Sequence, residues 1–193
     1  MASPSHRTPT SGLLSIQRIM GIDPGTVITG WGVIEAAGTA LRHLAHGTIN
    51  TTGAQDHGAR LRRIHQGIQR ALEEHKPDGV SLEKIFFARN AQSALKLGQA
   101  RGVALLAAGQ YGAPIHEYAA SEIKLAVVGY GQASKEQVQR MVYALLHLGE
   151  KIAVDAADAL AAAICHFHQK SFETRVLERA TDWGDARRRG GLS

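Results

Sequence analysis

Four acidic residues occupy positions where carboxylates could carry out chemistry. Asp23 ends an apolar stretch just before a proline-glycine turn, Glu83 lies in the apolar segment 80–85, and Asp155 and Asp158 begin an alanine-rich helix. A spacing of three places the last two carboxylates on one helix face. Each acid also has a simpler explanation: turn chemistry for Asp23, an ion pair with the neighbouring lysine or an edge position for Glu83, and the helix dipole for the aspartate pair.

Considered jointly, the acids favour a metal site. They converge if the first and fourth strands are neighbours and the late helix packs beside them. Such a cluster would repel itself unless divalent cations occupied it, and hard oxygen ligands select Mg²⁺ or Mn²⁺. Two ions about 3.5 to 4 Å apart would activate a water and stabilise the leaving oxygen in phosphodiester hydrolysis. The predicted chemistry is therefore two-metal hydrolysis without a covalent nucleophile.

Hydrophobic periodicity and turn residues predict the elements that must position these acids. Three strands come first and form an antiparallel meander, at residues 18–23, 30–35 and 41–50. Helices and strands then alternate. Three helices are predicted at 60–74, 91–108 and 121–128, a fourth begins after a capping box at Ser134, and a fifth runs from 155 to about 168. Extended segments are predicted at 79–85 and 114–118. This order predicts an α/β fold with one mixed five-stranded sheet flanked by helices on both faces.

The chain divides into three predicted parts. Residues 1–17 are rich in Pro, Ser and Thr and are expected to form a flexible N-terminal arm. Residues 18–170 form the folded domain, and residues 171–193 form a basic, flexible C-terminal tail.

Composition narrows the class of protein. At 193 residues the chain is too short for a large two-lobed ATPase, and its net charge of +5 favours a polyanionic partner. The single cysteine, Cys165, excludes an internal disulfide and a multi-cysteine zinc site, as expected in the cytoplasm. Apolar runs fall short of the roughly 20 residues of a membrane helix, so we expect a soluble cytoplasmic protein that does not bind membranes.

Several segments resemble the RuvC family of Holliday-junction resolvases, over about residues 18–170. The long central one is the most specific, and the segments are Gly21-Ile-Asp-Pro-Gly-Thr26, Ser81-Leu-Glu-Lys-Ile-Phe86, Asn90-Ala-Gln-Ser-Ala-Leu-Lys-Leu-Gly-Gln-Ala-Arg-Gly102 and Asp155-Ala-Ala-Asp-Ala-Leu160. The resemblance implies a ribonuclease H-like fold and a homodimer in which each subunit nicks one strand of a four-way DNA junction during recombination and repair. It also implies a junction-binding protein and a branch-migration motor of the Ruv system as partners.

The same resemblance assigns roles to residues. The metal ligands would be Asp23, Glu83, Asp155 and Asp158. Phe86 would stack on unpaired junction bases, and the other implied DNA contacts are Phe87, Arg89, Asn90, Lys96, Lys124 and Lys135. Without the resemblance, the aromatics would be core residues and the lysines surface charges.

The sequence leaves two alternatives open. One is a catalytically silent DNA-binding module that keeps the fold and the basic surface. The other is a nuclease of the same fold that acts on RNA or on another DNA structure. In each case, a helix that is apolar on more than one side could face a second subunit, through some of Leu97, Val103, Leu105 and Leu106.

Overall fold

A five-stranded mixed sheet forms the centre of the molecule. The structure, a computed structural model, describes residues 16–84 and 91–189. Its elements in chain order are β1 (Gln17–Asp23), β2 (Ile28–Ala37), β3 (Ala40–Asn50), α1 (His57–His75), β4 (Gly79–Glu83), α2 (Ala91–Tyr111), β5 (Ile115–Tyr118), α3 (Ala120–Val128), α4 (Lys135–Leu145) and α5 (Val154–Arg189). The strand order is β3-β2-β1-β4-β5, with β1 to β3 antiparallel and with β4 and β5 parallel to β1. The predicted fold class is confirmed.

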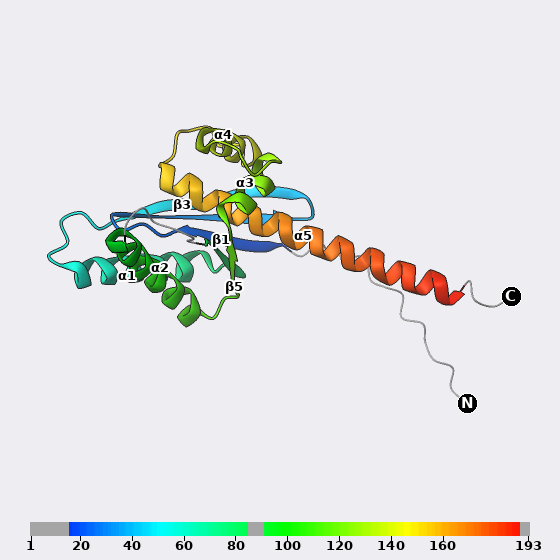
Figure 1. Cartoon of the computed structure of the whole chain (residues 1–193), viewed down its shortest axis with the longest axis horizontal. Helices are drawn as coiled ribbons and strands as arrows, with labels where there is room; N and C mark the ends of the chain where they lie inside the picture. The colour runs from blue at the N-terminus through cyan, green and yellow to red at the C-terminus, as the bar shows by residue number, and fades with distance from the viewer. Residues whose placement is uncertain (1–15, 85–90, 190–193) are drawn as a thin grey trace, which may run out of the picture.

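Helices cover both faces of this sheet (Figure 1). On one face, α1 and α2 pack over alternate strand residues such as Met20, Ile22, Val80 and Leu82. On the other face, α5 lies across the sheet with α3 and α4 outside it, over a second core that includes Ile19. Residues of opposite parity along β1 therefore serve two separate cores, as the two-residue period of a strand requires.

The first half of α5 approaches the sheet unusually closely. A Cβ atom added to Gly21 of β1 would lie 1.8 Å from the carbonyl oxygen of Ala159, and one added to Gly30 of β2 would lie 2.0 Å from the carbonyl oxygen of Asp155. The helix itself is rich in alanine where it faces the sheet, at Ala156, Ala159 and neighbouring positions. Small residues on both elements thus let two backbones touch, which holds the start of α5 against β1 and β2.

The last helix is longer than the sequence predicts. Its expected end near residue 168 is wrong, because α5 continues to Arg189 and projects away from the body (Figure 1). The buried pattern ends where the helix leaves the sheet, since Lys170, Phe172 and Val176 are all exposed. Beyond that point the helix is maintained by the helix propensity of its residues and not by packing against the sheet, and no proline interrupts it. The division into arm, nuclease domain and tail stays a prediction.

No helix in the described ranges is both long enough and apolar enough to cross a membrane.

The close approach of α5 leads to a stability prediction. Gly21→Ala should lower the free energy of unfolding by about 3 kcal/mol or more, because its Cβ would collide with backbone that cannot move without displacing α5. Gly109→Ala is the matched control: it lies in α2 with no atom within 4 Å of an added Cβ, and alanine there should be neutral or stabilise by up to about 1 kcal/mol. Urea unfolding measures both. Equal stabilities for the two variants would contradict the packing described here.

Candidate active site

The four predicted acids come together at one edge of the sheet. Asp23 is the last residue of β1 and Glu83 the last of β4, and these strands are parallel neighbours in which Ile22 pairs with Leu82. Asp23 and Glu83 are therefore the next residues along two adjoining strands. Asp155 and Asp158 enter from the first turns of α5.

Hydrogen bonds between Thr29 and Gly25 order the connection that follows Asp23. The buried hydroxyl of Thr29 donates to the carbonyl oxygen of Gly25 (3.0 Å) and accepts from the Gly25 amide (3.3 Å). The carbonyl oxygen of Asp155 contacts the adjoining position Gly30 of β2, which fixes the start of α5. The connection 24–27 contains a bend at Thr26 and Val27 and no regular turn at the proline-glycine pair, and it leaves Asp23 at the end of β1.

Burial and mutual repulsion raise the pKa of two acids in the cluster. The pKa of Asp23 rises from 3.8 to about 7, first because of burial and then because of the negative charges of Asp158, Glu83 and Asp155. The pKa of Glu83 is raised as well, again by burial and then by Asp158. Carboxylates held together in this way favour any positive charge that enters the site.

Lys135 supplies one such charge. Its Nζ lies 2.5 Å from Oδ2 of Asp158. Burial disfavours the ammonium form, but the hydrogen bond to Asp158 and the charges of Asp158, Asp23 and Asp155 together raise the pKa of Lys135. Lys135 is the first residue of α4 and follows the N-cap Ser134. The Ser134 amide donates to Gln137 Oε1 (2.8 Å), and the Ser134 hydroxyl accepts from the Gln137 amide (3.3 Å). The predicted capping box is confirmed, and it places this lysine at the site.

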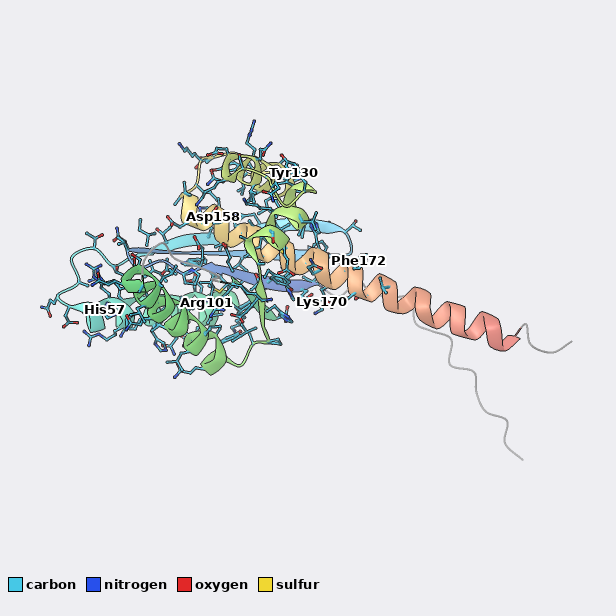
Figure 2. The ribbon with its side chains drawn as sticks, in the orientation of Figure 1. His57, Arg101, Tyr130, Asp158, Lys170 and Phe172 are labelled. Atoms are coloured by element: carbon cyan, nitrogen blue, oxygen red, sulfur yellow. The ribbon has the colours of Figure 1, made fainter. Side chains whose placement is uncertain are left out.

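A cavity of about 270 Å³ opens beside the acids. Its polar lining comes from Glu83, Lys124, Lys135 and Asp158, and the apolar part includes Ile123. This volume is slightly below the roughly 300–1,000 Å³ of small-molecule pockets, so the cavity suits one portion of a larger substrate. Figure 2 shows Asp158 at the start of α5, near the outer helices.

The donor set fits a hard divalent cation, because carboxylate oxygens are the ligands that such ions prefer. The charges of Asp158, Glu83 and Asp155 add to burial in raising the pKa of Asp23, and the charge of Asp158 adds to burial in raising the pKa of Glu83. Within the described ranges, however, no three His, Cys, Asp or Glu side chains stand together as a formed metal site. The metal-ligand roles of the four acids therefore stay a prediction.

The other predicted contacts fall in different places. Lys124 and Lys135 line the cavity beside the acids. Lys96 is exposed on α2 and lines a separate cavity of about 460 Å³, together with Thr26, His57 and Arg60. Four of the predicted DNA contacts lie outside the described residues: Phe86, Phe87, Arg89 and Asn90.

One polar contact behind the site is not predicted by the sequence patterns. Arg101 of α2 forms an ion pair with Glu117 of β5 and reaches the main chain of Glu83. The signal in the sequence was Glu117 itself, because a charged residue within a short strand requires an oppositely charged or hydrogen-bonding partner when it is partly buried.

This sheet order, with acids at the ends of β1 and β4 and at the start of the last helix, α5, defines a ribonuclease H-like nuclease. The family model for crossover junction endodeoxyribonuclease RuvC matches residues 19–166. The chain therefore belongs to the RuvC family, and both the resemblance and the endodeoxyribonuclease class are confirmed.

Relatives and solved structures agree. The chain is 52% identical over 149 residues to the RuvC of Geobacter sulfurreducens, covering 77% of this chain and 91% of that protein. It is 54% identical over 151 residues to the RuvC of Syntrophotalea carbinolica, covering 78% and 94%. Among solved structures, T. thermophilus RuvC in complex with a Holliday junction substrate matches with a TM-score of 0.77 and 34% identity, covering 82% of this chain and 97% of that chain.

The raised pKa of Asp23 leads to a prediction for the metal-free protein. Because the folded-state pKa is about 7 and the ordinary value 3.8, ionisation of Asp23 destabilises the fold as pH rises through that window. In EDTA, Asp23→Asn should therefore raise the free energy of unfolding at pH 8 by about 2 to 4 kcal/mol, and much less at pH 4.

Urea unfolding at the two pH values measures this difference. Glu73→Gln is the control, since it neutralises an exposed carboxylate on α1 and should leave the stability nearly unchanged at both pH values. An Asp23→Asn variant no more stable than the parent at pH 8 would show that burial and repulsion do not destabilise the ionised Asp23 carboxylate.

Proposed function

We propose that this chain is a divalent-metal-dependent endonuclease that resolves four-way DNA junctions by paired symmetric nicks. The observation that carries the proposal is the convergence of Asp23, Glu83, Asp155 and Asp158 at one sheet edge, where burial and then mutual repulsion raise the pKa of Asp23 to about 7. Membership of the RuvC family supports it, as does the similarity to a relative solved with a Holliday junction. The biological setting is homologous recombination and DNA repair.

Two Mg²⁺ or Mn²⁺ ions are the proposed cofactors, with the four acids as ligands. When bound, such ions supply an activated water and stabilise the oxygen that leaves the phosphodiester. The acids contribute by being held in place: β1 and β4 fix two of them through strand pairing, and α5 fixes the other two through its contact with Gly30.

Lys124 and Lys135 are proposed to act on the phosphate. Both ammonium groups line the cavity beside Glu83 and Asp158, so they can donate to the non-bridging oxygens of a phosphodiester and orient it. Lys135 already holds Asp158 by an ion pair, which fixes that carboxylate. A lysine in this position can also hold the proton that the departing oxygen requires.

The remaining DNA contacts are proposals from the family pattern. Phe86, with Phe87 beside it, would stack on unpaired bases at the junction centre, a contact worth about 1–3 kcal/mol per base. Arg89 and Asn90 would bind phosphates near that point, and Lys96 would do so from the neighbouring cavity. Such contacts select an opened junction and not a sequence.

A homodimer is proposed, with α2 as its contact. Leu95 and Leu106 are 68% and 55% exposed, and eleven residues apart they lie on one side of this helix. Two junction strands must be cut nearly together, and two-fold symmetry supplies two equivalent sites. A junction-binding protein and a branch-migration motor of the Ruv system are the proposed partners, and the cytoplasm is the proposed location.

The central test is cleavage of a synthetic mobile four-way junction with Mg²⁺ or Mn²⁺. The parent protein should give paired symmetric nicks, whereas Asp23→Asn and Glu83→Gln should each lower the single-turnover rate by at least about 1,000-fold, because each removes a proposed ligand charge. Junction affinity in EDTA, measured by fluorescence anisotropy, should stay within about threefold because the basic surface is intact.

Glu73→Gln should cut the junction like the parent, because Glu73 lies on α1, which contributes no residue to the acidic cluster. Absence of paired nicks by the parent across metals and salt would refute the function. Comparison with three-way, flap and RNA–DNA hybrid substrates distinguishes a nuclease of other specificity, and binding without cutting would identify a silent module.

A separate prediction concerns the dimer. Leu106→Glu places a charge on the exposed face of α2 and should shift the mass in light scattering from dimer to monomer, because a charge in an apolar contact is not solvated. Val176→Glu is the matched control on the projecting part of α5 and should remain a dimer. A monomeric parent that still makes paired nicks would exclude this arrangement.

A further inference from the structure

A charged contact ties three elements together behind the acidic cluster. The guanidinium of Arg101, on α2, forms an ion pair with Oε1 of Glu117, on β5. Its Nε also donates a long hydrogen bond of 3.5 Å to the main-chain carbonyl oxygen of Glu83, at the end of β4. One arginine therefore bridges α2, β5 and the main chain of a proposed metal ligand.

The bridge lies on the opposite face of the sheet from the chemistry. Along β4, Val80 and Leu82 face the core under α1 and α2, whereas the Glu83 side chain reaches the cavity that Asp158 also lines. Figure 2 shows Arg101 on α2 and Asp158 on α5, with the sheet between them. Arg101 therefore acts on Glu83 through its backbone and leaves its carboxylate free.

The contact is sheltered enough to hold its geometry. The Arg101 side chain is 21% exposed and the Glu117 side chain 35%, and Oε1 of Glu117, the atom that faces the guanidinium, is itself buried. An arginine-carboxylate pair in such surroundings keeps its orientation better than a surface pair does. Pairing of Glu83 with Tyr118 in the parallel ladder, and the hydrogen bond from the Lys84 amide to the Tyr118 carbonyl (2.7 Å), extend the same restraint.

We infer that Arg101 is a positioning residue, which with Glu117 fixes the Glu83 main chain so that its carboxylate meets the other acids. The inference rests on the proposed metal-dependent function. Because Arg101 belongs to α2, the same contact also joins the helix proposed as the dimer contact to the acidic cluster.

The test uses three variants of the full-length protein. Arg101→Lys keeps the positive charge but cannot reach both Glu117 and the Glu83 carbonyl. Glu117→Gln removes the acid. The double variant Arg101→Met/Glu117→Gln removes both charges together, so that no unpaired charge is left buried and folding is preserved. Circular dichroism and urea unfolding first establish which variants fold.

Two readouts then separate positioning from general stability. Electron paramagnetic resonance of free Mn²⁺ measures metal affinity of the DNA-free protein, and junction cleavage gives kcat and KM separately. The folded double variant should bind Mn²⁺ about 10-fold more weakly and lose about 10-fold in kcat, as expected when a group that orients a ligand is removed. KM should change less than about twofold, and Arg101→Lys should recover part of both losses.

Arg70→Met is the matched control. It also removes one arginine charge, but Arg70 bonds only a carbonyl of its own helix, at Gln66, among the contacts the structure describes. It should match the parent in Mn²⁺ affinity and kcat.

Wild-type Mn²⁺ affinity and kcat in the folded double variant would overturn the inference, as would a parallel loss of junction affinity. If none of the three variants folds, the pair stabilises the fold and does not position the ligand, which also overturns the inference. A parent protein that neither binds Mn²⁺ nor cuts the junction would instead refute the proposed function.

Discussion

The contact between the backbone of α5 and two glycines of the sheet is the constraint on which the site depends. Gly21 and Gly30 leave no room for a Cβ because the carbonyl oxygens of Ala159 and Asp155 occupy that space. A side chain at either glycine would push α5 outward, and a shift of even 1 Å at a reacting centre is costly to catalysis. The helix start, which carries Asp155 and Asp158, can meet the ends of β1 and β4 only because these strand positions are bare.

Bringing the acids together has an electrostatic cost that the rest of the fold must offset. Burial and like charges raise the pKa of Asp23 to about 7, so the metal-free site opposes its own ionisation. The ion pair between Lys135 and Asp158 relieves part of the repulsion, and the two cores on either face of the sheet supply the stability that tolerates the remainder. Electrostatic destabilisation of this kind is typical of sites whose residues are selected for function and not for stability.

Local patterns in the sequence predicted much of this arrangement. Alternating and helical periodicity, with turn residues and one capping box, located the ten elements found in residues 16–84 and 91–189, and the placement of Asp155 and Asp158 on one helix was correct. The end of α5 was wrong because a helix beyond residue 168 needs no buried face to persist. The ion pair of Arg101 was missed because its partner Glu117 is sixteen residues away on another element, and the pair exists only after β5 has joined the sheet. Sequence periodicity carries no information about such long-range pairs.

The two faces of the sheet carry different features, and Glu83 at the end of β4 has contacts on both faces. One face carries α5 and the acidic cluster, while the other carries α2, whose exposed leucines are free to meet a second subunit. The Glu83 main chain is bonded from the α2 side and its carboxylate serves the α5 side. In a two-fold dimer formed through α2, each acidic cluster would therefore be connected to the symmetry axis by one helix and one strand. The separation of the two sites would then be set by the fold itself, which is the condition for nicks at symmetric positions on two strands.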